Sequence, residues 1–208
     1  MSRPVDYYFS LISPWAYLGH AEFLRIAKQA DAPVTYKPVA LGKLFPESGG
    51  LPLGQRHPLR RAYRMIELQR WREKRNLPLV LQPKFWPFDV EFADRLTIAA
   101  AEKYPDLIGD FLALAFRAVW VEEQNLAVEG VLREILKSSG IEDEDLLADA
   151  RKPPTADIYA QNLSDALRLG VFGSPCYVID GEVFWGQDRL EMVSEMLASE
   201  RAPFRADA

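Results

Sequence analysis

The stretch that decides the fold is VDYYFSLISPWAYLGHAEFLRIAKQADAPVTYKPV, residues 5–39. Its first six residues are β-branched and aromatic and end at turn-forming residues, which predicts a short buried strand. Apolar residues then recur at a spacing of three or four from Trp15 to Ala27, a pattern typical of an amphipathic helix. Residues 34–39 read as a second strand. Strand, helix and strand in this order predict a βαβ unit whose two strands are parallel.

The C-terminal part of the chain predicts the other half of the same sheet. Cys176–Ile179 and Glu182–Trp185 read as two strands joined by the hairpin turn Asp180-Gly181. A helix is expected before them, over residues 157–169, and another after them, over residues 188–199. Because hairpin strands are antiparallel, the completed sheet is expected to be mixed.

The middle of the chain interrupts this α/β pattern. Residues 42–55 are rich in glycine and proline and read as a loop, residues 58–75 predict a helix, and helical patterns dominate from residue 91 to residue 150. We therefore expect one discontinuous α/β domain, formed by residues 1–42 and 157–208. A linker loop and a large all-helical insertion, residues 43–156, would separate its two parts.

Composition narrows the classes of partner. The protein has 208 residues, is 49% hydrophobic and carries a formal charge of -5. Nucleic acids and anionic membranes require a basic surface, so we expect neither as a partner. No uninterrupted apolar run approaches the roughly 20 residues that a membrane span requires. Basic residues do gather between positions 56 and 75, which we interpret as a solvated helix face, with a pocket for a small anion as the alternative.

Cysteine and histidine are too sparse for disulfide or metal chemistry. The single cysteine, Cys176, cannot form an internal disulfide, which favours a cytoplasmic location, and it reads as a small buried strand residue. His20 and His57 are far apart in sequence and have no metal-ligand spacing around them, so we expect no metal. The glycine-rich loops that bind nucleotides are absent from the sequence.

Three short motifs each have a structural and a functional interpretation. Ser13-Pro14 is a favoured helix start, yet a hydroxyl at a helix N-terminus also favours a bound anion or thiolate. Ser174-Pro175 is either an ordinary strand entry or a cis-proline that presents its preceding peptide group to a ligand. Asp188 can cap a helix with Glu191, or it can hold an amino-acid-like ligand.

Together these residues resemble the 2-hydroxychromene-2-carboxylate isomerases and the kappa-class glutathione transferases, two families with a thioredoxin-like fold and a helical insertion. The resemblance extends over nearly the whole sequence. It is carried by the segments Tyr7-Tyr8-Phe9-Ser10, Ser13-Pro14-Trp15-Ala16-Tyr17-Leu18, Gly170-Val171-Phe172-Gly173-Ser174-Pro175-Cys176-Tyr177-Val178 and Gly186-Gln187-Asp188-Arg189-Leu190.

The resemblance implies a glutathione site. In redox relatives the position of Ser13 opens a C-P-x-C motif, whereas Ser13 here is expected to hydrogen-bond the glutathione sulfur and favour its thiolate. Several further residues are implied to contact glutathione. They are Pro14, Arg60 (where lysine is usual), Ser174 next to the family's cis-proline Pro175, and Gln187 and Asp188 at the γ-glutamyl end.

Two positions depart from the pattern of these families. Gly50 stands where asparagine is common, which removes one expected glutathione contact. The usual Asn-Thr pair ahead of the Gly-Val-Phe-Gly run is Asn162-Leu163 here.

The implied activity is isomerisation of an aromatic or chromene-like carboxylate, as in the degradation of aromatic compounds, by a cytoplasmic homodimer that uses glutathione as its cofactor. We expect Trp86, Phe88 and Phe45 to stack on the substrate ring, and Lys84 or Arg61 to meet its carboxylate. Two alternatives stay open at this point. One is a kappa-like transferase or peroxidase that consumes glutathione, and the other is a non-catalytic module that binds thiol peptides.

Overall fold

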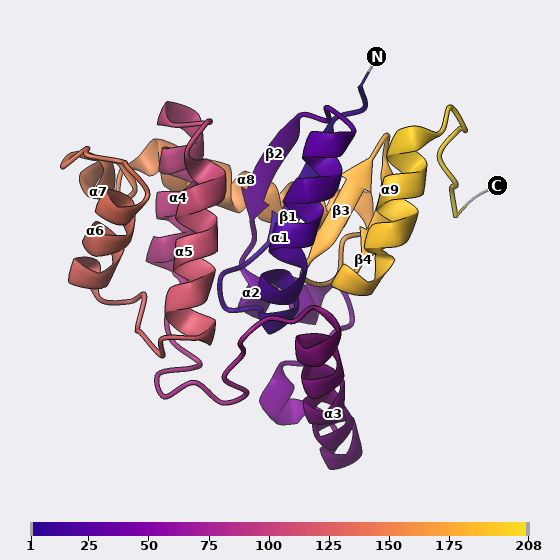
Figure 1. Ribbon diagram of the computed structural model, residues 1–208, viewed down its shortest axis with the longest axis horizontal. Helices are drawn as coiled ribbons and strands as arrows, with labels where there is room; N and C mark the ends of the chain where they lie inside the picture. Colours follow the sequence, from indigo (N-terminus) through magenta and orange to yellow (C-terminus); the bar gives the residue numbers. More distant parts are fainter. Residues whose placement is uncertain (1, 207–208) are drawn as a thin grey trace.

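The central strand of the sheet is β1 (Val5–Phe9), whose apolar and aromatic residues are buried on both faces. The computed structural model describes residues 2–206 (Figure 1). Strand β2 (Val34–Pro38) runs parallel to β1 on one side, and β3 (Cys176–Ile179) runs antiparallel to it on the other. Strand β4 (Glu182–Trp185) completes the order β2-β1-β3-β4 as an antiparallel hairpin with β3. The sheet is therefore mixed, as predicted.

Helices cover both faces of this sheet, because alternate residues of β1 point to opposite sides. Tyr7 and Phe9 join the main core with helices α1 (Pro14–Gln29) and α9 (Leu190–Ala198), and Figure 1 shows these two helices over the same face. Tyr7 also stacks on Tyr177 of β3, with ring centroids 5.3 Å apart. Tyr8 points the other way, into a smaller core with α8 (Pro153–Leu169).

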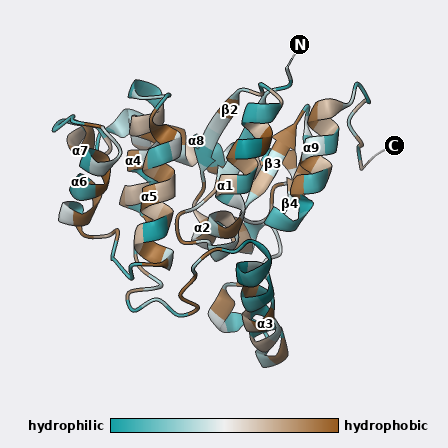
Figure 2. Cartoon of the chain, viewed as in Figure 1, coloured by the Kyte–Doolittle hydropathy of each residue, from teal (hydrophilic) through white to brown (hydrophobic). Residues whose placement is uncertain are grey.

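The predicted helical insertion is present, and most of it packs beside the sheet. Its helices are α3 (Pro58–Lys74), α4 (Glu91–Lys103), α5 (Ile108–Trp120), α6 (Glu129–Ser138) and α7 (Leu146–Asp149). Helix α4 packs against β2 and α8, and α5 packs against α1. Helix α3 extends away from the other helices in Figure 1. Figure 2 shows both hydrophilic and hydrophobic residues along it, and its apolar residues Leu59, Tyr63 and Ile66 are exposed.

The predicted loop over residues 42–55 is wrong. Helix α2 (Leu41–Glu47) and the short 3-10 helix η1 (Leu53–Gln55) occupy much of it. Glycine and proline suggested an irregular segment, but Leu44 is fully buried in the smaller core, and this tertiary contact outweighs local propensity. Helix α8 begins at Pro153, so the expected domain boundary at residue 157 falls inside it.

The end of the sequence also differs in detail from the prediction. In place of one helix from residue 188, a 3-10 turn, η2 (Gln187–Arg189), leads into α9. No helix formed by residues 2–206 combines the length and the apolar character that crossing a bilayer requires.

Candidate active site

Ser13 lies at the N-terminus of α1, where the backbone leaves β1. Its own backbone is extended, with φ -95° and ψ 115°, and its Oγ accepts a hydrogen bond from the Ala16 N–H at 3.2 Å. Pro14 follows as the first helical residue. The same hydroxyl donates to the carbonyl oxygen of Ser174 at 3.1 Å. Ser13 therefore caps the helix, as one interpretation held, and also faces the second predicted motif.

The first turn of α1 keeps one backbone donor for a ligand. Pro14 has no N–H, the Ala16 N–H is bound by Ser13 Oγ, and the Tyr17 N–H donates to Ser13 O at 3.1 Å. The Trp15 N–H donates to no atom within residues 2–206. Because a helix N-terminus carries partial positive charge, this N–H and the Ser13 hydroxyl suit an anion.

Ser174 and Pro175 enter β3 directly beside Ser13. The bond between them is cis, which was one of the two interpretations of this motif. Ser174 Oγ accepts from the Ser10 N–H at 3.3 Å, and Pro175 O accepts from the Gly186 N–H at 2.9 Å. The fold thus brings residues about 160 positions apart in sequence into one hydrogen-bonded group.

Residues of the helical insertion hold the turn that leads to Ser13. Trp120 Nε1 donates to the Leu11 carbonyl at 3.1 Å, and Trp86 Nε1 donates to the Ile12 carbonyl at 3.0 Å. The two indoles also pack on each other, with centroids 5.9 Å apart. The position of the Ser13 hydroxyl therefore depends on the insertion as well as on the sheet.

A buried carboxylate, Asp94 of α4, completes this support. Its Oδ1 accepts from the Leu11 N–H at 3.2 Å, and its Oδ2 accepts from the hydroxyls of Ser10 at 2.9 Å and Tyr159 at 3.1 Å. Burial raises the pKa of Asp94 to about 7, although the three donors act in the opposite direction. Sequence reasoning missed Asp94; the available signal was an acid one helical turn from the apolar residues Val90 and Ile98.

The two residues expected at the γ-glutamyl end of the glutathione site, Gln187 and Asp188, have different surroundings. Gln187 is buried, with 2% of its surface exposed, and its Oε1 accepts from Arg75 Nε at 3.2 Å. Arg75 Nη2 also reaches the Gln187 carbonyl oxygen at 3.1 Å. Asp188 is exposed and its carboxylate meets Arg189 at 2.7 Å.

The proposed capping of the last helix by Asp188 is wrong. Helix α9 has Arg189 at its N-cap position, and among the described residues no side chain caps it with a hydrogen bond. The reason is the preceding turn: Gly186, at φ 99°, directs the backbone into η2, so Asp188 lies inside this turn and not at the start of α9. The Asp188 carboxylate thus lies at the surface, where it pairs with Arg189.

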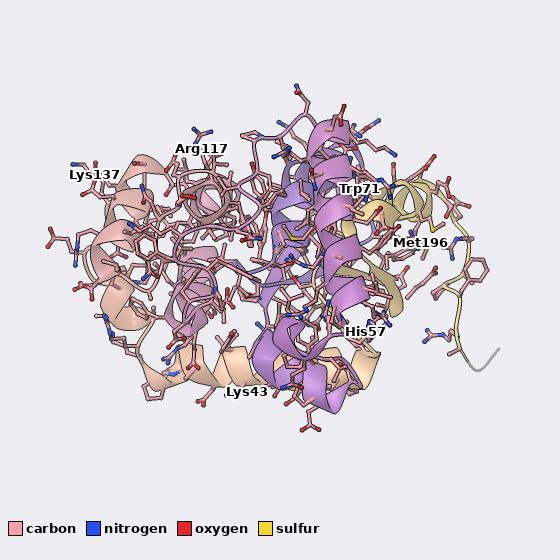
Figure 3. All side chains as sticks on the ribbon, turned by 90° about the horizontal axis from the view of Figure 1, so that it is seen from below. Lys43, His57, Trp71, Arg117, Lys137 and Met196 are labelled. Carbon is pink, nitrogen blue, oxygen red and sulfur yellow. The ribbon has the colours of Figure 1, made fainter. Side chains whose placement is uncertain are left out.

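The remaining predicted site residues belong to α3 and the segments around it. Arg60 is exposed on the first turn of α3, and Lys84 is exposed, with its Nζ 5.1 Å from the Phe85 ring centroid. Phe88 and Trp86 are partly buried against the main core. Figure 3 views the molecule from below, with α3 in front, His57 near one end of it and Trp71 toward the other.

Gly50, which departs from the family pattern, and Asn162, which keeps it, each have a local structural role. A Cβ atom on Gly50 would lie 2.9 Å from Cδ1 of Phe45, so the glycine permits close packing on this ring. Asn162 is buried on α8, and its Nδ2 donates to the Pro38 carbonyl at 3.1 Å. It thereby ties α8 to the end of β2.

Cys176 is buried in β3 under the site, and burial raises its pKa to about 12. A thiol with so high a pKa is not a nucleophile near neutral pH, since the thiolate is the reactive form. Within residues 2–206 no group of three or more His, Cys, Asp or Glu side chains is arranged to hold a metal ion.

Comparison with known proteins identifies the family to which this fold belongs. The model of the DsbA-like thioredoxin domain matches residues 4–198. The protein belongs to this family. Among solved structures, a 2-hydroxychromene-2-carboxylate isomerase superposes with a TM-score of 0.81 at 21% identity, covering 93% of this sequence and 94% of that one. The thioredoxin-like fold with a helical insertion is therefore confirmed.

Relatives in sequence agree with the resemblance found in the motifs. The 2-hydroxychromene-2-carboxylate isomerase of Sphingobium xenophagum is 25% identical over 95% of this sequence and 99% of its own length. Glutathione S-transferase kappa 1 of Caenorhabditis elegans is 23% identical over 93% of this sequence and 90% of its own. The cytosolic disulfide reductase DsbM of Pseudomonas aeruginosa, solved with GSH, has a TM-score of 0.69 at 18% identity and covers 94% of this sequence and 100% of that one.

Proposed function

We propose that this protein is a glutathione-dependent isomerase of an aromatic or chromene-like carboxylate. The observation that carries the proposal is the Ser13 hydroxyl at the N-terminus of α1. It lies against the Ser174 carbonyl and beside the Trp15 N–H, which has no acceptor within residues 2–206. This group offers a sulfur anion two donors but holds no second sulfur for disulfide exchange. The isomerase relative, which aligns over 99% of its own length, supports the same activity.

The residues around Ser13 fit glutathione in their chemistry. The Ser174 peptide group can pair with the cysteinyl backbone, the Asp188 carboxylate with the γ-glutamyl amino group, and the Arg60 guanidinium with a carboxylate. Bound glutathione would supply the thiolate that adds reversibly to the conjugated substrate and leaves again after rotation about the former double bond. Gln187 then acts through its bond to Arg75, which fixes the turn that carries Asp188.

The Ser13 hydroxyl has the central task in this site. It now donates to Ser174 O, and rotation about its Cβ–Oγ bond can turn the same proton toward a sulfur while its oxygen continues to accept from Ala16. That rotation releases the Ser174 carbonyl to accept from a ligand N–H. With the positive end of α1 nearby, the hydroxyl lowers the pKa of a thiol that it contacts.

A kappa-like transferase is the second candidate, and the kappa relatives at 21% to 24% identity favour it. The two activities differ in the fate of glutathione, which an isomerase returns and a transferase or peroxidase consumes. Measuring free glutathione after many turnovers separates them. The homodimer and the cytoplasmic location stay predictions.

The test compares glutathione binding by wild type and Ser13→Ala, using calorimetry and the ultraviolet absorbance of the thiolate across pH. We expect saturable binding by wild type and a bound thiol pKa well below the free value of about 8.5, which Ser13→Ala raises back toward that value. Ser164→Ala is the matched control, because this serine is exposed on α8 and bonds only the carbonyl one turn earlier.

Circular dichroism of Ser13→Ala is needed alongside, because loss of the helix cap costs about 1 kcal/mol. Absence of glutathione binding by folded wild type at millimolar concentration would contradict the proposal. An unshifted thiol pKa in bound glutathione would instead favour a non-catalytic thiol-peptide binder.

A further inference from the structure

Arg64 is a half-buried cation whose environment within residues 2–206 contains no compensating acid. Its guanidinium lies 5.6 Å from the centroid of the Trp86 ring, and no carboxylate of the described residues lies within 4 Å of it. Among the described residues, the one polar contact of its side chain is Met65 Sδ at 3.9 Å. Burial and the nearby Arg56 lower its pKa to about 10, yet it stays charged at neutral pH. A desolvated cation of this kind is stabilised by an anion.

Other half-buried arginines of the protein have partners. Arg75 donates hydrogen bonds to Gln187, and Arg201 forms a bidentate ion pair with Glu182 at 2.7 and 2.9 Å. Arg64 differs from both, because the charged neighbour that shifts its pKa is the cation Arg56. The surroundings of Arg64 are therefore positive, which agrees with the small-anion interpretation of this basic segment.

Trp86 connects Arg64 to the active site. The indole carries the guanidinium over its face, while its Nε1 bonds the carbonyl of Ile12, the residue before Ser13. Trp86 also packs against Trp120. Because Arg64 and Trp120 both pack against the Trp86 indole, we assign Trp86 a supporting role in place of the predicted stacking on substrate. A guanidinium over the face of an indole can still present two parallel N–H donors to a carboxylate.

We propose that Arg64 binds the carboxylate of the aromatic substrate and so determines the specificity of the site for acids. This inference rests on the proposed function and extends it, replacing Lys84 and Arg61 as the residue that meets the carboxylate. The side chains of Lys84 and Arg61 are exposed. Arg64 is partly desolvated, and it lies over Trp86, which bonds the turn that leads to Ser13. Desolvation strengthens a charge-assisted hydrogen bond relative to one at the surface.

The test uses two unreactive probes of chromene-like shape, chroman-2-carboxylate and its neutral amide, which have no double bond for a thiol to attack. Calorimetry gives the affinity of wild type, Arg64→Gln and Arg64→Lys for both probes, with and without saturating glutathione. Arg70→Gln is the control, because Arg70 lies on the same helix but is exposed and paired with Glu67. Glutamine keeps the helix propensity of arginine, and circular dichroism verifies the fold.

We expect wild type and Arg70→Gln to prefer the carboxylate by about tenfold or more. Arg64→Gln should bind both probes equally, with its affinity for glutathione unchanged, and Arg64→Lys should recover only part of the preference. A wild-type preference that survives in Arg64→Gln, or no preference in wild type, overturns the inference.

Weaker glutathione binding by Arg64→Gln, with the chroman preference intact, overturns it too and assigns Arg64 to the glycyl carboxylate of glutathione. If wild type binds no glutathione, the proposed function fails separately. The chroman preference measured without glutathione then decides the role of Arg64 by itself.

Discussion

Replacing Asp94 with asparagine should remove a pH dependence of folding stability that the buried carboxyl imposes. The Asp94 carboxyl is fully buried, and burial raises its pKa from 3.8 to about 7. Between these two values the folded protein keeps the proton that the unfolded protein has released. Stability from this group is therefore complete below about pH 4 and is lost as the pH rises through about 7. The difference corresponds to up to about 4 kcal/mol.

Asparagine can occupy the same place without titrating. Its Oδ1 can accept from the Leu11 N–H, and its amide N–H groups can donate to the hydroxyls of Ser10 and Tyr159, which are able to accept as well as donate. The variant should therefore fold, and its stability relative to wild type should increase steadily from about pH 4 to about pH 7.5.

The free energy of unfolding should be measured by urea denaturation for both proteins across this range. The pH dependence of wild type alone is uninformative, because His20 contributes a second one. Burial lowers the pKa of His20 to about 4, so its contribution to stability increases with pH up to about 6.5, whereas that of Asp94 decreases. The difference between the two proteins cancels His20 and isolates Asp94. Asp157→Asn, an exposed carboxyl on α8, is the matched control and should show no such trend.

A pH-independent difference would refute this reasoning. So would a wild type that gains stability over Asp94→Asn as the pH rises. Either result would mean that the three donors hold Asp94 as a carboxylate throughout, and that hydrogen bonding outweighs desolvation at this site.

Two further predictions concern Gly50, which departs from the family pattern, and Asn162, which ties α8 to the end of β2. Gly50→Ala should cost about 1–2 kcal/mol of stability and lower the melting temperature by several degrees, because the new Cβ would lie 2.9 Å from Phe45. Gly54→Ala, with no neighbour within 4 Å, should change the melting temperature little. Equal effects of the two substitutions would contradict the close-packing explanation. Asn162→Leu should lower the free energy of unfolding in urea by about 1–3 kcal/mol, because the Pro38 carbonyl at the end of β2 loses its buried donor. Gln161→Leu, at the exposed neighbouring position, should be nearly neutral. A neutral effect of Asn162→Leu would mean that water satisfies the Pro38 carbonyl.

Local patterns were sufficient for the elements that form the sheet. The βαβ unit of residues 5–39 and the hairpin of Cys176–Ile179 and Glu182–Trp185 have strong periodicity and clear turn residues, so their type and pairing followed from the sequence. Helix α2 did not, because Pro46 and the nearby glycines indicate a loop, while burial of Leu44 decides the outcome.

The structure brings together the residues of the short, local motifs, whereas residues that depend on distant partners were missed from the sequence. Ser13 at a helix start and Ser174-Pro175 at a strand entry are visible in the sequence, and the fold places the Ser13 hydroxyl 3.1 Å from the Ser174 carbonyl oxygen. Asp94 and Arg64 read as ordinary charges of helix faces. Their importance comes from burial and from partners on other elements, which no spacing rule reveals.

The insertion and the thioredoxin-like part form one functional unit, because the turn before Ser13 is held almost entirely from the insertion. Asp94 binds the Leu11 N–H, Trp120 the Leu11 carbonyl and Trp86 the Ile12 carbonyl. In the proposed enzyme the same Trp86 supports Arg64, so one indole touches both the thiol-activating turn and the residue that selects the acid. A change at Trp86 that alters substrate choice should therefore also alter the pKa of bound glutathione. A loop that only covered the site would leave that pKa unchanged.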